Sequence, residues 1–279
     1  MNPSPDEHKQ RTTAIFDLVA DGYDHPALRL FPFCADRLVD AIKPKAGQKI
    51  LDIGTGTGAV ATALAQAVLP SGRVQAIDLA QNMIDRAVAN VTKRGLANID
   101  FHVMDAERLE FKSRYFDHVV ASYVLFFCPD VEAALKEWRR VLKPGGTIVF
   151  TSFTDNAFEP LVSDLRQQLQ RFGVEWPRGA FKRLASPQLC SELLTNAGFE
   201  DVSIRSEALG YHLASGEDWW QVLWNSGFRG LLEQLDSPQL AALRCAHLQA
   251  IAEHQDTNGL WLNAETLFCL GHRPAATPQ

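Results

Sequence analysis

The sequence predicts an α/β fold built on a doubly wound, mostly parallel β-sheet. Between residues 49 and 153, short apolar runs alternate with helical patterns five times, and such alternation builds a parallel sheet through right-handed crossovers. Two further strand patterns near the C-terminus bring the expected sheet to seven strands. A glycine-rich turn follows the first apolar run directly, at the place where a Rossmann-like sheet of this kind binds its ligand.

Each predicted element follows from its apolar spacing and from the turn residues that flank it. We expect strands at 49–53, 73–78, 99–105, 116–124 and 147–153, and helices at 59–69, 81–91 and 131–142. The strand at 116–124 is almost continuously apolar, which is typical of a strand buried on both faces.

The C-terminal half of the chain is less regular. We expect helices at 186–197, 217–235 and 238–253, and strands at 201–211 and 260–272. The segments at 154–184 and 214–255 interrupt the sheet, and we expect these helical insertions to form a lid over the C-terminal edge of the strands. The expected organisation is a helical lid segment at 1–45, a cofactor-binding core at 46–153, the completion of the sheet with substrate-cap insertions at 154–273, and a disordered tail at 274–279.

Composition and charge argue against several classes of protein. The 279-residue chain has a net charge of −6, so no nucleic-acid or anionic-membrane partner is expected. The N-terminus lacks the apolar core of a signal peptide, and the longest apolar stretch, 119–128, is too short for stable membrane insertion. The five cysteines lie far apart without a CxxC pair, which is typical of reduced thiols in a cytoplasm. We therefore expect a cytoplasmic protein without a metal site.

The glycine-rich turn lies within ILDIGTGTGAV, residues 50–60. Gly54, Gly56 and Gly58 permit a tight turn and let a ligand approach the backbone closely. A dinucleotide template of G-x-G-x-x-G/A also fits Gly54, Gly56 and Ala59, with Asp78 at the spacing expected for a ribose contact. The turn by itself does not distinguish a nicotinamide cofactor from S-adenosylmethionine. A Walker loop is excluded because no Gly-Lys-Ser/Thr follows.

The motifs around this turn are specific in combination. In chain order they are FDLVADGYD at 16–24, ILDIGTGTG, VQAIDLAQNMIDRA, FHVMDAERLEF, FDHVVASYVLFFCPD and ALKEWRRVLKPGGTIVF. Over residues 14–153 the chain resembles the class I S-adenosylmethionine-dependent methyltransferases, and within them the group around the ubiquinone/menaquinone C-methyltransferases. The resemblance implies that S-adenosyl-L-methionine is the cofactor and that a methyl group passes to a small-molecule acceptor, apolar or aromatic in character.

The resemblance also implies which residues hold the methionine portion of the cofactor. Gly54, Thr55 and Gly56 are expected beside it, with Asp52 near the ammonium group, directly or through water. Ser122, at the end of the fourth strand, is expected under the reactive sulfonium.

The adenosine portion is expected at the ends of the second and third strands. Asp78 would accept both ribose hydroxyls, and Leu79 and Met83 would pack on the adenine plane. Asp105 would accept from the adenine amino group, and the Ala106 amide would donate to a ring nitrogen. The alternative for the two aspartates is a helix cap or a solvated loop charge.

The acceptor side carries fewer signals. Tyr23 either covers the cofactor from an N-terminal lid or packs as an ordinary aromatic residue. Candidate bases are His25, Tyr123 and His212, and the sequence assigns the role to none of them. We expect no metal at His247 and His254, which are seven residues apart without carboxylate or cysteine partners in metal geometry.

An aromatic cluster in the C-terminal half is open to two interpretations. Its members are Trp219, Trp220, Trp224 and Phe228. They line either an aromatic acceptor pocket or the core of a helical cap, and their helical spacing favours the core. Two alternatives to a methyltransferase stay open at this point, an NAD(P)-dependent oxidoreductase and a non-catalytic cofactor-binding protein.

Overall fold

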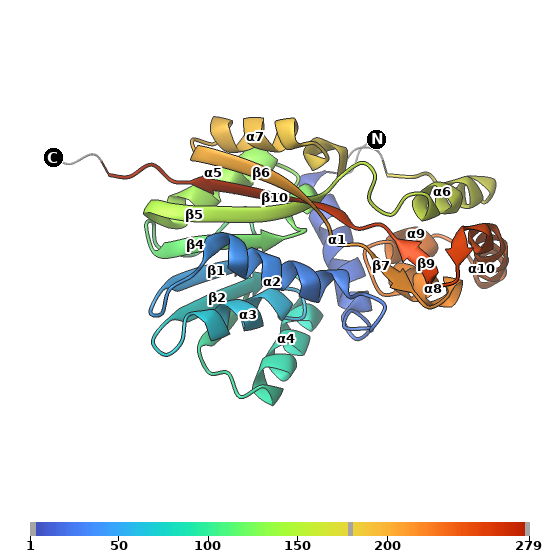
Figure 1. Cartoon of the computed structure of the whole chain (residues 1–279), viewed down its shortest axis with the longest axis horizontal. Coiled ribbons are helices and arrows are strands. Elements are labelled where there is room, and N and C mark those ends of the chain that lie inside the picture. The colour runs from blue at the N-terminus through green and yellow to red at the C-terminus, as the bar shows by residue number, and fades with distance from the viewer. Residues whose placement is uncertain (1–3, 178–180, 277–279) are drawn as a thin grey trace.

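The computed structural model describes residues 4–177 and 181–276, and a seven-stranded sheet lies at its centre (Figure 1). The strand order is β3-β2-β1-β4-β5-β10-β6. These strands are β1 (Lys49–Ile53), β2 (Arg73–Asp78), β3 (Ile99–Val103), β4 (Phe116–Ser122), β5 (Leu142–Phe153), β6 (Glu200–Ala208) and β10 (Glu265–His272). Only β10 runs antiparallel to its neighbours, so the expected mostly parallel sheet is confirmed.

Helices cover both faces of the sheet because the strand order reverses at β1. The chain moves outward from β1 to β2 and β3, and then in the opposite direction through β4 and β5. Right-handed crossovers therefore place α3 (Ala59–Ala67) and α4 (Gln81–Lys93) on one face and α5 (Val131–Val141) on the other. The helix α2 (Leu30–Ile42) packs on α3, and α7 (Pro187–Asn196) packs on β6 and β10.

The point of reversal lies between β1 and β4. These strands pair in parallel from Ile50 beside His118 to Ile53 beside Ala121, and both are largely buried. Gly54 follows β1 and Ser122 ends β4, so the two residues lie at the same edge of the sheet. Open α/β sheets bind ligands in the crevice at such an edge.

The N-terminal helix α1 (Pro5–Val19) is attached through a hydrophobic cluster of its own. Val19 and Ala20 pack with Ala80 and Met83, and this cluster is separate from the main core. The C-terminal end of α1 therefore rests on the start of α4.

The C-terminal half forms a cap beyond one end of the main sheet (Figure 1). Its helices are α6 (Leu161–Arg171), α8 (Gly216–Trp224), α9 (Arg229–Leu232) and α10 (Ser237–Ile251). A second, antiparallel sheet joins β7 (Tyr211–Leu213), β9 (Gly259–Leu262) and β8 (Gln255–Asp256) in that order. Short 3-10 turns occur at η1 (Leu125–Phe127), η2 (Phe181–Leu184) and η3 (Ala252–His254).

Several predicted boundaries in this half are wrong. The expected helix at 217–235 is two helices, because the chain leaves the helix after Trp224 and resumes it at Arg229. The expected strands at 201–211 and 260–272 each contribute to both sheets, since the chain breaks near Gly210 and at Asn263 and changes sheet there. The second sheet was not predicted at all.

The strand β5 begins at Leu142, before the expected start at 147, and includes residues 143–146. Gly145 donates its N–H to the Arg273 carbonyl, and the Gly146 carbonyl accepts from the Arg273 N–H. Pairing with the end of the chain therefore extends the strand. Residues 277–279 of the predicted tail lie outside the described residues. Across the described part of the chain, no helix combines the length and apolar character needed to span a membrane.

Candidate cofactor site

A cavity of about 120 Å³ lies at the sheet edge where β1 and β4 end. Residues from α1, the glycine turn, the end of β2, the segment after β3 and the end of β4 line it. All but two of the predicted site residues are among them, namely Tyr23, Gly54, Gly56, Asp78, Leu79, Met83, Asp105, Ala106 and Ser122. The two exceptions are Asp52 and Thr55, which are buried and do not line the cavity.

The glycine turn depends on left-handed backbone. Gly54 has φ +64° and Gly56 has φ +53°, a region that L side chains rarely adopt. A Cβ on Gly54 would also lie 2.1 Å from Cγ2 of Val124. The Thr55 N–H donates to the Ile77 carbonyl across 2.9 Å, which fixes the turn against the end of β2.

Asp78 ends β2 and holds two backbone amides around the cavity. Its Oδ2 accepts from the Gly56 N–H at 2.9 Å, and its Oδ1 accepts from the Ala80 N–H at 3.0 Å. Ala80 is the N-cap of α4, and that helix has no side-chain cap hydrogen bond, so Asp78 holds the residue before the helix rather than capping it, and it also lines the cavity. Burial raises the pKa of this carboxyl, and the amide hydrogen bonds oppose that shift.

Asp52 is a buried carboxyl behind the turn, with an exposed fraction of 1%. Its Oδ2 accepts from the Thr55 hydroxyl at 2.7 Å, whereas its Oδ1 has no hydrogen-bond partner among the described residues. Burial raises the pKa of Asp52 to about 7, and the hydrogen bond from Thr55 opposes the shift. A buried carboxylate with an unused oxygen fits a cationic ligand group, because a charge there needs a partner.

Asp105 lies beyond β3 and is joined to α1. Its Oδ2 accepts from the Lys9 ammonium at 2.7 Å, and its Oδ1 accepts from the Glu107 N–H at 2.9 Å. Lys9 also pairs with the Glu107 carboxylate. Burial alone would lower the pKa of Lys9, but its hydrogen bonds to Asp105 and Glu107 outweigh burial and raise it.

The contribution of α1 to the cavity was not predicted at residue level. The helix lines the cavity with Lys9, Thr12, Thr13 and Phe16. Their spacing of three, four and seven residues places them on one face of a helix. That spacing was visible in the sequence, but the face is too polar to stand out as a buried stripe.

Tyr123 follows Ser122 and is held firmly at the rim of the cavity. Its backbone has φ +55°, its N–H donates to the Thr151 hydroxyl, and its phenol forms a 2.8 Å hydrogen bond with Thr266. Its ring stacks on Phe153 with centroids 4.2 Å apart. Burial raises the pKa of the phenol well above its ordinary value, which opposes a role as a base.

The two histidines considered as bases lie away from this cavity. His25 Nδ1 accepts from the Ala27 N–H in the loop after α1, and His212 packs edge-on against Trp261 in the second sheet. In the described residues, no group of His, Cys, Asp and Glu is arranged to hold a metal ion.

The tryptophan cluster packs in the cap, as its spacing indicated. Trp219 is fully buried and donates its indole N–H to Nε2 of His247 at 2.8 Å, and Trp220 is also buried. Trp224 stacks against the Arg229 guanidinium. Phe228 differs from them, because it lines a second cavity.

The second cavity has a volume of about 600 Å³ and adjoins the end of β5. Its aromatic lining is formed by Phe153, Phe158, Trp176 and Phe228. Phe153 is the residue on which Tyr123 stacks, and Tyr123 lines the first cavity. A stacked pair of rings therefore connects the two cavities.

Known proteins identify the class to which this fold and site belong. A family model described as a methyltransferase domain matches residues 51–150. Aklanonic acid methyltransferase DauC from Streptomyces sp. (strain C5) is 36% identical over 189 residues, which cover 64% of this chain and 85% of that relative. The ubiquinone/menaquinone biosynthesis C-methyltransferase UbiE from Coxiella burnetii is 29% identical over 229 residues, which cover 76% of this chain and 89% of the relative.

The fold is also similar to that of a known protein. The solved structure of YcgJ from Bacillus subtilis matches with a TM-score of 0.59 at 19% identity, covering 88% of this chain and 99% of that one. The chain belongs to the S-adenosylmethionine-dependent methyltransferases. It is similar to the ubiquinone/menaquinone C-methyltransferase group, as its motifs indicated. The oxidoreductase and the non-catalytic binder are thereby set aside.

Proposed function

We propose that this enzyme transfers a methyl group to a small aromatic molecule bound in the second cavity. The observation that carries the proposal is the aromatic cavity of about 600 Å³ next to the ring pair of Tyr123 and Phe153. Flat apolar ligands pack well on such rings. The names of the relatives DauC and UbiE refer to aklanonic acid and to ubiquinone/menaquinone biosynthesis, which fits an acceptor of this kind.

We propose the following cofactor contacts for the first cavity. Asp78 takes the ribose hydroxyls with the lone pairs that the two amides leave free, and Leu79 and Met83 contact the adenine. Asp52 balances the ammonium group through its unused oxygen. Asp105 serves the adenine amino group while Lys9 neutralises its charge. Tyr23 closes the cavity beside Gly56, whose Cβ would lie 3.6 Å from its ring.

The protein's part in catalysis is to position the reactants and to exclude water. When bound, S-adenosylmethionine supplies an electrophilic methyl group on its sulfonium. Ser122 and Tyr123 form the floor at that position, and the two hydrogen bonds of Tyr123 keep the floor rigid. Of the three candidate bases, His25, Tyr123 and His212, only Tyr123 lines the first cavity, and its phenol is bonded to Thr266, so the acceptor's proton is assigned to none of them.

We also propose that α1 acts as a lid on the cofactor. The helix is attached by Lys9 at one end and by the Val19 cluster at the other, and the Asp17 carboxylate accepts from the Asn82 N–H at 2.8 Å. These contacts can break without opening the main core, because α1 belongs to a separate hydrophobic cluster.

A cavity-filling variant tests the location of the acceptor. Val162 lines the second cavity and is buried. We expect Val162→Trp to abolish methylation of hydroxynaphthoquinone and anthraquinone acceptors, measured as S-adenosylhomocysteine release, and to leave S-adenosylhomocysteine binding within about twofold of the parent. The control is Leu18→Trp at an exposed position of α1. Unchanged turnover by a folded Val162→Trp enzyme would rule out this cavity.

A further inference from the structure

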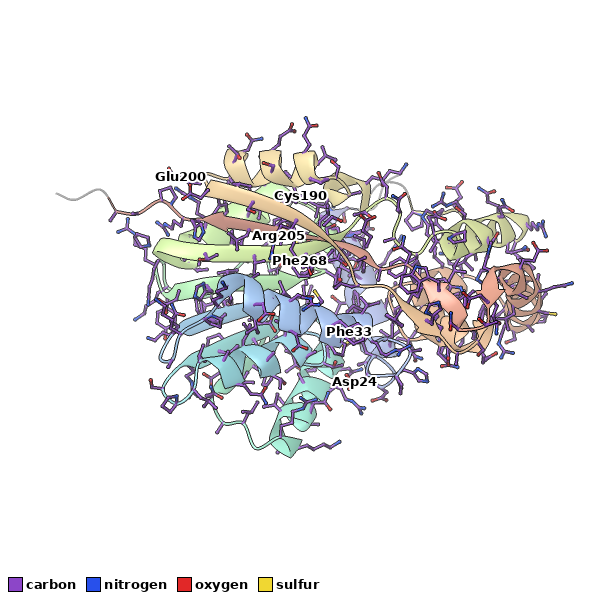
Figure 2. The ribbon with its side chains drawn as sticks, in the orientation of Figure 1. Asp24, Phe33, Cys190, Glu200, Arg205 and Phe268 are labelled. Carbon is purple, nitrogen blue, oxygen red and sulfur yellow. The ribbon has the colours of Figure 1, made fainter. Side chains whose placement is uncertain are left out.

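The aromatic lining of the second cavity includes one positively charged side chain. Arg166 lines this cavity and belongs to α6. Figure 2 shows the cap helices with their side chains beyond one end of the main sheet. The Arg166 side chain is half-buried, and its guanidinium lies over the Trp176 ring, 5.0 Å from the centroid. Trp176 in turn packs against Phe228 at 6.1 Å. The guanidinium is thus part of the aromatic wall.

Arg166 has no polar partner among the described residues. Its Nε is buried without a hydrogen bond, and no carboxylate lies within 4.0 Å of the guanidinium. The neighbouring acid on α6, Asp164, pairs with His254 at 2.7 Å instead. An unpaired, half-buried cation lowers stability, and its cost is recovered when an anion binds.

The other charges of the cavity leave Arg166 available. Glu159 accepts from the Ser163 N–H at 3.2 Å, and Asp155 and Lys182 are exposed at the boundary of the cavity. The boundary of the cavity therefore has both a negative and a positive side chain, Asp155 and Lys182. The cation that packs on the aromatic lining is Arg166. An anion recognised here sits on the aromatic surface.

We propose that Arg166 binds an anionic oxygen group, a carboxylate or an ionised phenol, on the ring system of the aromatic acceptor. This inference rests on the proposed function and narrows its substrate class from aromatic molecules to aromatic anions. A guanidinium presents paired N–H donors in a plane, which matches a carboxylate, and stacking on Trp176 fixes that plane. The apolar rings of the acceptor then lie against Phe158 and Phe228.

A matched pair of probes separates charge recognition from ring binding. Anthraquinone-2-carboxylate and anthraquinone-2-carboxamide have the same rings and differ in charge. With the enzyme saturated by S-adenosylhomocysteine, we expect calorimetry to show the carboxylate binding about 10- to 100-fold more tightly than the amide, the range for a hydrogen-bonded charge. Arg166→Gln and Arg166→Met should remove this preference and leave amide binding within about twofold.

The control variants distinguish anion binding by Arg166 from a purely structural role of this residue. Arg171→Gln removes an exposed cation from the same helix and should keep the preference, and Arg166→Lys should restore part of it. Equal binding of both probes by the parent enzyme would overturn the inference and leave the proposed function standing. Equal loss of both probes in the Arg166 variants would make Arg166 a packing residue and overturn it too. If neither probe binds the saturated enzyme, the proposed function and this inference both fail.

Discussion

The Lys9 ammonium donates to Oδ2 of Asp105 across 2.7 Å and thereby ties α1 to the end of β3. Asp105 lies 96 residues further along the chain. The same ammonium pairs with Glu107, and both carboxylates line the cofactor cavity. One charge on α1 therefore pairs with two carboxylates that line the candidate cofactor cavity.

Lys9→Met is expected to loosen the lid without unfolding the enzyme. Losing these partly buried ion pairs costs roughly 1 kcal/mol, which corresponds to about a fivefold faster release of S-adenosylhomocysteine. Stopped-flow displacement measures that rate. Lys112→Met removes an exposed lysine outside the cavity and should change nothing. An unaltered release rate for Lys9→Met would mean that α1 does not gate the site.

Asp78→Ala is expected to weaken cofactor binding strongly. Hydrogen bonds to a charged group are worth roughly 1.5–3 kcal/mol each, so losing two that share one carboxylate costs about 2–4 kcal/mol. Affinity for S-adenosylhomocysteine should fall about 30- to 1,000-fold by calorimetry. The melting point should also fall, because the Gly56 and Ala80 amides lose their acceptor.

The matched control for this variant is Asp85→Ala on the exposed side of α4. It removes a carboxylate that accepts from Gln81 and does not line the cavity. If Asp78→Ala keeps its affinity within about threefold while its melting point drops, Asp78 only holds the Gly56 and Ala80 amides in place.

Gly56→Val tests close approach of the ligand to the turn. Its φ of +53° strains any branched residue by about 1–2 kcal/mol, and the side chain would enter the cavity. Gly95→Val suffers a similar strain at φ +68°, with open space around its Cβ and no part in the cavity. We expect both variants to lose similar stability and only Gly56→Val to lose S-adenosylhomocysteine binding. Retained binding by Gly56→Val would contradict the expected contact.

Asp52→Asn is expected to stabilise the ligand-free enzyme at the expense of affinity. The folded pKa of about 7 is raised above the ordinary value of 3.8, so the ionised form lowers stability increasingly as the pH rises between these values. At pH 8 the variant should gain about 2–4 kcal/mol in unfolding free energy, and near pH 4 almost nothing. Its affinity for S-adenosylhomocysteine should fall. Denaturant titrations at both pH values measure the unfolding free energy of variant and parent. Equal unfolding free energies at pH 8 would contradict the prediction.

His247→Gln is expected to reduce acid sensitivity. Burial lowers the pKa of His247 to about 4 from 6.5, so the unfolded chain binds more protons between these values. Stability is then lost as the pH falls from about 6.5 toward 4, by up to ~3 kcal/mol. Glutamine retains an acceptor for the Trp219 N–H but does not titrate.

The measurement for His247 is the difference in unfolding free energy between variant and parent at each pH. His118, with its pKa also lowered by burial to about 4, acts in the same direction, and Asp52 acts in the opposite one. Both are present in parent and variant, so the difference isolates His247. If the unfolding free energies of variant and parent change with pH in parallel, titration of His247 does not lower stability at acid pH.

The parallel half of the sheet and most of the residues that line the first cavity could be predicted because their signals are local. A short apolar run ending in Asp78 or in the glycine turn defines both a strand and the group at its end. Lys9 and Arg166 were not predicted, because their roles depend on residues that are distant in the sequence. Each is an ordinary basic residue on a helix, and only the folded chain brings Asp105 to the first and Trp176 to the second.

The cap was harder to predict because tertiary contacts decide its boundaries. Apolar spacing continues from Trp219 to Leu232, yet the helix is interrupted at 225–228. Gly230 lies where a Cβ would meet Ile15 of α1 at 2.4 Å, so packing against another element shapes this segment. A second sheet made of strands of two to four residues leaves no periodic pattern to detect.

The hydrogen bond from the Gly56 N–H to Asp78 has a kinetic consequence. Because this bond and the one from Thr55 to Ile77 are internal to the protein, the turn holds its shape before any ligand arrives. Preorganisation of this kind removes the entropic penalty of ordering a loop on binding. With α1 acting as the proposed lid, association should be limited by the fraction of molecules in which α1 is open, and the observed on-rate constant should report that population.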